Sequence, residues 1–172
     1  MRRSNYELEI AFVIIIILSG VYVAYDLLAE PQGSHPIGQA LGITGTLLML
    51  MTETLYSLRK RTRLLERTGP VRNWLSFHIV TGLVGPFLVL MHTGLHFRGL
   101  AGLTMLLTVV VVVSGFTGRY LYTSLRRQGA SPHLQRLFSV WHTIHIPLGV
   151  ALFTSVALHI GAAIFFRAGV FR

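Results

Sequence analysis

Two apolar stretches of the chain carry histidines at the same spacing. The first, HIVTGLVGPFLVLMHTG, covers residues 78–94, and the second, HIPLGVALFTSVALHIG, covers residues 145–161. In each stretch, the second histidine follows the first after fourteen residues. Fourteen residues make about 3.9 helical turns and rise about 21 Å, so both histidines of a stretch would lie on nearly one face of a helix, one toward each surface of a membrane.

This spacing predicts two metal sites built from pairs of imidazoles. One apolar segment separates the two stretches, so two helices formed by them would run parallel through a membrane. His78 would then lie level with His145, and His92 with His159. Neutral imidazole is a common iron ligand, and two imidazoles at one level suit the axial positions of a b-type haem. We therefore expect two non-covalent haems, each held by two histidines.

Glycines recur at matched positions beside the histidines. Gly82 and Gly149 follow the first histidine of each stretch after four residues, and Gly94 and Gly161 follow the second after two. A glycine near a ligand leaves room for the macrocycle, although any single one could equally serve helix packing. Three glycines of the intervening segment could relieve crowding there in the same way: Gly102, Gly115 and Gly118.

Two arginines lie six residues outside the histidines. Arg72 precedes His78, and Arg98 follows His92. Each would lie near a membrane surface, where its guanidinium could pair with the propionate groups of a haem. The alternative is that each arginine only extends its charge out of the bilayer from a helix end.

The remaining histidines do not repeat the fourteen-residue spacing. His96 and His142 could bond propionates or lie in the membrane interface, and His142 is the alternative ligand to His145. His35 and His133 are expected in solvated loops.

The composition is that of a membrane protein. Hydrophobic residues make up 52% of the 172 residues and charged residues 12%, about half the share usual in soluble domains, and the mean hydropathy is +0.62. The absence of cysteine excludes disulfides, Cys-ligated iron–sulfur clusters and covalent c-type haem. A net charge of +9 would suggest nucleic acid in a soluble protein, but here the cations flank apolar segments, so no nucleic-acid partner is expected.

Five segments are long and apolar enough to cross a bilayer, and lipid requires such segments to be helical. The sequence therefore predicts a single all-α transmembrane domain. Residues 1–35 would form an additional N-terminal helix and outer loop, and residues 36–166 a four-helix di-haem core. The first segment is expected to be a retained helix rather than a signal peptide. The expected spans are residues 9–28, 37–58, 74–97, 100–123 and 137–166.

The basic residues indicate the orientation. All but Arg98, Arg167 and Arg172 of the 15 Lys and Arg residues lie at the N-terminus or in and beside the connections 59–73 and 124–136. The positive-inside rule places these segments in the cytoplasm and the C-terminus outside. The pattern is typical of a multi-pass protein of the bacterial cytoplasmic membrane. Four aromatic residues fit an interfacial belt on the cytoplasmic side: Tyr120, Tyr122, Trp74 and Trp141.

The histidine pattern resembles that of transmembrane di-haem cytochromes b. It is similar to the haem-bearing helical core of cytochrome b in quinol–cytochrome c oxidoreductases and to the membrane domain of ferric reductases and NADPH oxidases. The resemblance covers roughly residues 36–166 and implies one haem on His78 and His145 and another on His92 and His159. The Pro-Glu-Trp-Tyr segment of quinol-oxidising cytochromes b is absent from the sequence. No nucleotide-binding domain follows the last span, so the chain is not expected to oxidise NADPH itself.

These features predict an electron-transfer subunit of a membrane oxidoreductase complex. Its expected partners are the bilayer, quinone, and other redox subunits such as a cytochrome c or an iron–sulfur protein. Three alternatives stay open: a complete quinol-dependent reductase, a metal transporter or sensor, and a structural subunit. The metal alternative needs carboxylates among its ligands, and the two histidine-bearing segments contain no Asp or Glu. Glu53 could serve a proton path or a quinone site, or pair with a basic residue.

Overall fold

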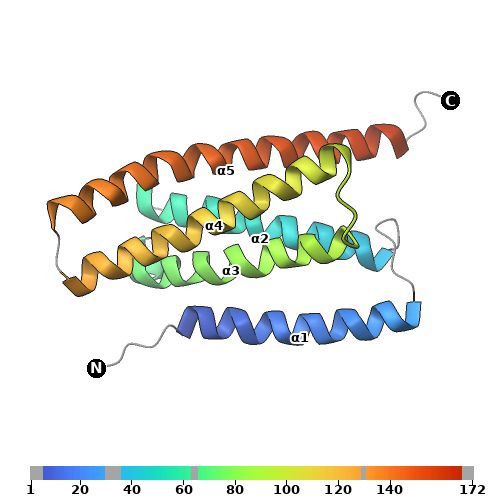
Figure 1. The fold of residues 1–172 in the computed structure, drawn as a ribbon, viewed down its shortest axis with the longest axis horizontal. Coiled ribbons are helices and arrows are strands. Elements are labelled where there is room, and N and C mark those ends of the chain that lie inside the picture. The colour runs from blue at the N-terminus through green and yellow to red at the C-terminus, as the bar shows by residue number, and fades with distance from the viewer. Residues whose placement is uncertain (1–5, 30–35, 63–65, 129–130, 168–172) are drawn as a thin grey trace. The chain divides into compact units, whose positions relative to one another are not determined.

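The computed structural model describes residues 6–29, 36–62, 66–128 and 131–167, and every long element in this part of the chain is an α-helix (Figure 1). Each of the five helices is long and apolar enough to cross a membrane, which indicates a multi-pass membrane protein and confirms the expected all-α class with five spans. The elements are α1 (Tyr6–Ala29), α2 (Pro36–Arg61), the short 3₁₀ helix η1 (Glu66–Thr68), α3 (Val71–His92), α4 (Gly99–Gln128) and α5 (Pro132–Arg167).

Three helix ends differ from the prediction by five residues: the end of α3, the end of α4, which extends to Gln128 rather than residue 123, and the start of α5. Helix α3 ends at His92, not at residue 97, because Gly94 and Leu95 adopt positive φ angles of 53° and 61° that break the helical path. Helix α5 begins at Pro132, five residues before the predicted start. The Ser131 hydroxyl accepts a hydrogen bond from the Leu134 N–H at 3.3 Å, and proline suits the first helical position.

The earlier start of α5 changes the place of one predicted loop residue. His133 lies in the first turn of α5 and is exposed, so its assignment to a loop was wrong. His35 lies outside the described residues. Pro86 lies inside α3 and Pro147 inside α5, and both helices are continuous through these prolines.

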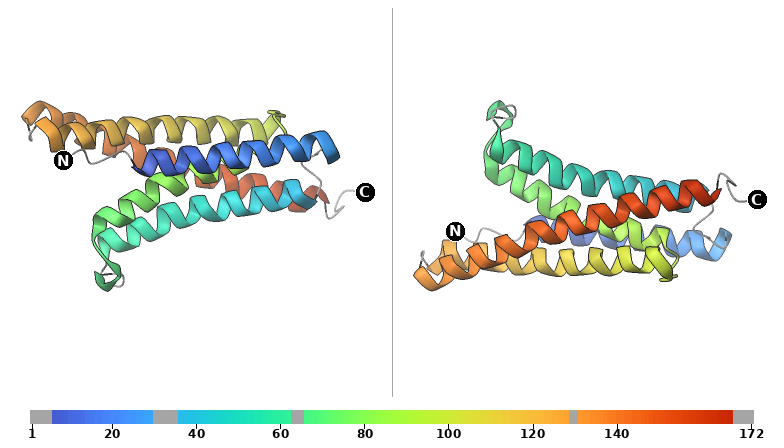
Figure 2. Two further views of the ribbon diagram at one scale, coloured as in Figure 1. Left: turned by 90° about the horizontal axis from the view of Figure 1, so that it is seen from below. Right: turned by 90° about the horizontal axis from the view of Figure 1, so that it is seen from above.

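The chain forms two compact units, Met1–Leu95 with helices α1 to α3 and His96–Arg172 with helices α4 and α5. Within the first unit, α3 packs against both α1 and α2, and within the second, α4 packs against α5 (Figure 2). Each histidine-bearing helix is therefore paired with the helix that precedes it in the sequence. The predicted division into residues 1–35 and a four-helix core of 36–166 stays a prediction.

The core of the first unit lies along α3. Val84, Leu88 and Met91 are buried there. Side chains of α1 and α2 pack against them: Ile14, Leu18, Tyr22, Leu41 and Leu48. At the start of α1, the Tyr6 hydroxyl donates to the Ser76 hydroxyl at 2.8 Å, and Ser76 donates in turn to the Glu7 carboxylate at 3.2 Å. These contacts fix α1 along α3, and they make α3 the helix on which the first unit is built.

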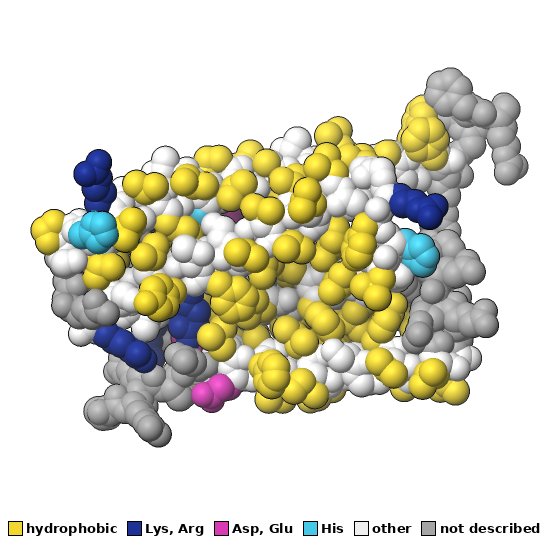
Figure 3. Space-filling model, viewed as in Figure 1, with side chains coloured by type: hydrophobic (Ala, Val, Ile, Leu, Met, Phe, Trp, Pro, Cys, Tyr) yellow, Lys and Arg dark blue, Asp and Glu magenta, His cyan; other side chains and the backbone are white. Residues whose placement is uncertain are grey.

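The charged side chains gather toward helix ends. On the face shown in Figure 3, hydrophobic side chains cover the middle stretches of the helices, and Lys and Arg lie near their ends. Arg59 and its two basic neighbours occupy the last turn of α2, and the Arg59 guanidinium donates to the Gly69 carbonyl at 3.1 Å. This bond closes the connection from α2 toward α3, where Gly69 has a φ of 108°. Part of the predicted basic loop, including Arg63, lies outside the described residues.

Candidate functional site

Both histidines of α3 bond to the backbone of α2. His78 Nδ1 lies 3.1 Å from the carbonyl oxygen of Thr52, and His92 Nδ1 lies 2.7 Å from that of Gly38. Both imidazoles are half-buried. The two acceptors are fourteen residues apart on α2, as the two histidines are on α3. One helix therefore provides matching partners for both members of the first histidine pair.

A close contact between two glycines sets this register. Gly45 lies midway between Gly38 and Thr52, and Gly85 lies midway between the two histidines. A Cβ added at Gly45 would lie 2.7 Å from the Gly85 carbonyl oxygen, and one added at Gly85 would lie 3.0 Å from the Gly45 carbonyl oxygen. Only glycine permits the backbones to approach so closely. This approach brings the carbonyls of α2 within reach of the short histidine side chains.

These two bonds fix the tautomer of each imidazole. A carbonyl oxygen only accepts hydrogen bonds, so Nδ1 of His78 and of His92 must carry the proton. A helical carbonyl has a second lone pair for such a bond while it also accepts within its own helix. In a neutral imidazole the other nitrogen, Nε2, then keeps its lone pair. A metal-ligating histidine in proteins shows this same arrangement, with its other nitrogen donating to a carbonyl or carboxylate.

A buried pair of hydroxyls supports the His78 contact. The Thr52 hydroxyl donates to the Thr81 hydroxyl at 2.6 Å, which donates on to the Phe77 carbonyl at 2.8 Å. Both threonine side chains are buried. The Tyr56 ring also lies against the His78 imidazole, with 5.1 Å between ring centroids. The side chain of Thr52 thus bonds α2 to α3 at the same residue whose backbone carbonyl contacts His78.

Gly42 makes room for the His92 imidazole. A Cβ at Gly42 would lie 2.8 Å from Cγ and 2.9 Å from Nδ1 of His92. Gly38 and Gly42 form a GxxxG pattern on α2, in which the first glycine provides the carbonyl and the second the space for the ring. Small residues at this spacing commonly line close helix contacts in membranes.

Alanine at Gly42 is expected to destabilise the first unit by about 1–3 kcal/mol, the usual cost of overpacking. The added methyl group would push the His92 imidazole away from the Gly38 carbonyl. Unfolding of the micelle-solubilised chain in a denaturing-detergent titration would measure the loss. The control is the same substitution in a His92→Ala background, where the ring is gone and the cost should disappear. An equal cost in both backgrounds would contradict the packing described here.

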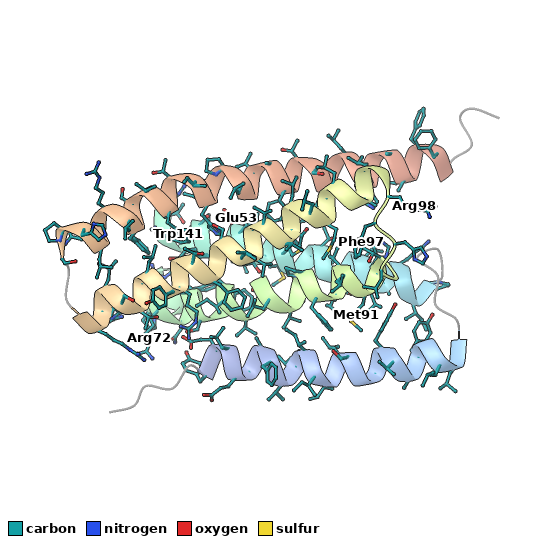
Figure 4. All side chains as sticks on the ribbon, in the orientation of Figure 1. Glu53, Arg72, Met91, Phe97, Arg98 and Trp141 are labelled. Atoms are coloured by element: carbon teal, nitrogen blue, oxygen red, sulfur yellow. The ribbon has the colours of Figure 1, made fainter. Side chains whose placement is uncertain are left out.

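In the second unit, His145 is held by α4. Its Nδ1 lies 3.0 Å from the Ser114 hydroxyl. The backbone carbonyl of the same serine accepts a hydrogen bond of 2.8 Å from the Trp141 indole nitrogen. Trp141 points from α5 toward α4 (Figure 4), and its ring stacks on the His145 imidazole with centroids 5.0 Å apart and planes inclined by 25°. One serine therefore contacts both aromatic rings.

The indole of Trp141 occupies the space that Gly118 leaves. A Cβ at Gly118 would overlap three ring atoms of the indole. Gly118 is therefore needed for the tryptophan, and Gly102 is close to the backbone of Phe97 at the start of α4. The aromatic-belt interpretation of Trp141 missed its contacts with Ser114 and His145.

The α4–α5 register also positions the second histidine of α5. Thr104 and Ser155 share a buried hydrogen bond of 2.7 Å, ten residues before Ser114 on α4 and ten after His145 on α5. Continued along both helices, this antiparallel register brings His159 opposite Leu100, in the first turn of α4. His159 is half-buried.

The other predicted site residues lie near the ends of the spans. Arg72 lies in the first turn of α3, and Arg98 directly precedes α4; both are exposed (Figure 4). His96 is exposed in the connection after α3. His142 is half-buried, with its ring 6.1 Å from that of Trp141. Each predicted pair joins a histidine of the first unit to a histidine of the second. The pairing of His78 with His145 and of His92 with His159 therefore stays a prediction.

The four matched glycines differ in their surroundings. Within the first unit, a Cβ at Gly82 would meet only the Thr52 side chain, at an ordinary 3.5 Å. Gly94 has a φ of 53°, which gives it a backbone role in ending α3. Within the second unit, a Cβ at Gly149 or Gly161 would meet no described atom within 4 Å. Packing inside the units therefore does not require glycine at Gly82, Gly149 or Gly161.

Among the described residues, no group of three or more His, Asp and Glu side chains is placed to hold a metal ion. The histidine contacts described above instead present single imidazoles, each held by the neighbouring helix. Comparison with protein-family models, with curated proteins and with solved structures finds no match for this chain.

Proposed function

We propose that the chain is a di-haem cytochrome b that carries electrons across the bilayer as a subunit of a membrane oxidoreductase complex. His78 and His145 would ligate one haem, and His92 and His159 the other. The single observation that carries the proposal is the pair of hydrogen bonds from the α3 histidines to α2. Each makes Nδ1 the proton-bearing nitrogen, so that the lone pair on Nε2 of a neutral imidazole would be available to bind iron.

The donor set suits a haem better than a bare metal ion. A haem iron takes four ligands from its own macrocycle and needs only two more from the protein. Isolated imidazoles on different helices supply two, without the clustered carboxylates and histidines of a protein-only metal site. When bound, a haem with two histidine ligands supplies one-electron transfer.

The protein's own contribution is to orient the ligands and exclude water. The carbonyls of Thr52 and Gly38 hold the two imidazoles of α3 and raise their basicity as ligands. In a bilayer, the buried side chains around Met91 and the apolar spans would keep water from the two haems. Gly82, Gly149 and Gly161, which unit packing does not require, would give the macrocycles room.

Charged and polar groups near the span ends would bind the propionates. Arg72 lies at the start of α3, on the side of His78, and Arg98 follows the end of α3, on the side of His92. Guanidinium groups pair well with carboxylates there. In the proposed assembly, His142 and His96 would donate further hydrogen bonds to the propionates. Gly94 would serve the site by ending α3 directly after its ligand.

The basic residues at the ends of α2 and α4 orient the chain in the proposed assembly. They would place the N-terminus in the cytoplasm and the C-terminus outside a bacterial cytoplasmic membrane. The His78 level would then lie near the cytoplasmic surface and the His92 level near the outer one. Electrons would pass between quinone or a partner redox subunit on one side and a partner such as a cytochrome c or iron–sulfur protein on the other.

A haem assay on the purified chain tests the proposal. The pyridine haemochrome method should give about two b-type haems per chain, with the absorption bands of low-spin, six-coordinate iron. Protein concentration from quantitative amino-acid analysis makes the ratio reliable. A chain that is folded and helical but has no visible absorption after expression with sufficient haem supply would overturn the proposal.

A further inference from the structure

We infer that Trp141 and Ser114 are positioning residues that hold the His145 imidazole in one orientation and thereby tune the haem it would ligate. This inference rests on the proposed function. Three contacts form a closed group: Trp141 donates to the Ser114 carbonyl, the Ser114 hydroxyl contacts His145 Nδ1, and the indole stacks on the imidazole.

These contacts restrict both the direction of the Nδ1 edge and the plane of the imidazole ring. Rotation about the Cβ–Cγ bond of a histidine is broad and nearly two-fold in the absence of contacts. The Ser114 hydroxyl at 3.0 Å fixes the edge that carries Nδ1, and the indole face, inclined by only 25°, fixes the plane of the ring. With its edge and its plane both fixed, the imidazole can approach an iron in one orientation only.

The position of the indole is itself determined by α4. Its nitrogen is tied to the Ser114 carbonyl at 2.8 Å, and the ring lies in the space left by Gly118. Gly115, one residue after Ser114, lies 4.0 Å from His145 Cε1, measured from an ideal Cβ. The small residues Ser114, Gly115 and Gly118 of α4 thus leave the space in which both rings pack.

The same group distinguishes His145 from its neighbour and from its proposed partner. His142 meets the Trp141 indole edge-on at 6.1 Å, outside the Ser114 contact, so His145 is the held imidazole. His78 uses a backbone carbonyl, which accepts only, whereas His145 contacts a hydroxyl, which can donate or accept. The two imidazoles of the proposed haem therefore have unlike Nδ1 partners, and side-chain substitution can remove only the partner of His145.

The test compares three variants of the full haem-loaded chain. Trp141→Phe keeps an aromatic ring and removes the indole N–H, and Ser114→Ala removes the hydroxyl and keeps the carbonyl. Trp74→Phe is the matched control, because Trp74 packs edge-on against Phe77 and is the only other tryptophan. The readouts are haem content, a redox titration that resolves the two haems, and the low-spin EPR signal, which reports the orientation of the two axial imidazoles.

The first two variants should keep about two haems and shift one of the two redox waves together with one low-spin EPR signal, while Trp74→Phe shifts neither. Unchanged waves and signals in both Trp141→Phe and Ser114→Ala, in a chain whose His145→Ala variant loses a haem, would overturn this inference and leave the proposed function intact. If Trp141→Phe fails to fold, Ser114→Ala alone decides between these results. A wild-type chain without haem would overturn both.

Discussion

Alanine in place of His78, His92, His145 or His159 is expected to leave the purified chain with about one haem instead of two. Each substitution removes one axial ligand, and a macrocycle held from one side only would be lost during purification. The haem at the other level should stay, because the glycine contact that sets the α2–α3 register does not involve either imidazole. Pyridine haemochrome analysis of each variant measures the loss.

Double variants separate the proposed pairing from any other. His78→Ala with His145→Ala removes both ligands of one haem, so about one haem should remain. His78→Ala with His92→Ala removes one ligand from each, so none should remain. The control is His133→Ala, because His133 is exposed in the first turn of α5. This variant should keep both haems. The opposite order of the two double variants would mean that the ligands are paired along each helix and would contradict the proposed pairing.

Alanine at Gly45 is expected to disturb both histidine levels at once. The added Cβ would lie 2.7 Å from the Gly85 carbonyl oxygen and 3.0 Å from Leu88 Cβ. Since a backbone atom cannot turn aside, α2 and α3 must separate, at a cost of about 1–3 kcal/mol or more. The Thr52 and Gly38 carbonyls, seven residues to either side, would then move away from His78 and His92 together.

The measurements for Gly45→Ala are the haem content and the free energy of unfolding in mixed micelles. Haem content should fall well below that of any single histidine variant. Gly20→Ala on α1 is the matched control, because a Cβ there meets no described atom within 4 Å. It should be neutral or stabilise the helix by up to about 1 kcal/mol. Normal loading of both haems in Gly45→Ala would show that the glycine contact does not set the register.

The five helices followed from composition because lipid leaves an apolar segment of this length no other structure. The ends of the helices were predicted less accurately. The predicted span through residue 97 ran past Gly94, the one residue there that signals a helix end, and Leu95 adopts a positive φ that its side chain does not favour. The early start of α5 did have a signal, the Ser131–Pro132 pair, which combines a capping hydroxyl with a proline suited to the first turn.

The sequence likewise showed only part of the candidate site. The histidine spacing was visible in the sequence, but its supports were not, because Thr52 and Gly38 act through backbone carbonyls that every residue possesses. The GxxxG pattern at Gly38 and Gly42 was the available sign of a close helix contact. Trp141 lies one turn before His145, on the same face of α5, and that spacing could have linked it to the histidine rather than to the membrane interface.

Helix α3 ends at His92, whereas α5 continues for eight residues beyond His159. The aligned peptide dipoles of α3 give its C-terminal end about half a negative charge, which stabilises a nearby cation by about 0.3–1 kcal/mol. His78 lies beyond the first turn of the same helix and has no comparable field. In the proposed electron carrier, this macrodipole would favour the oxidised, more positive state at the His92 level, so that an electron rests more readily at the level of His78. The length of one helix would in this way create a difference in reduction potential between the two ends of the transmembrane path.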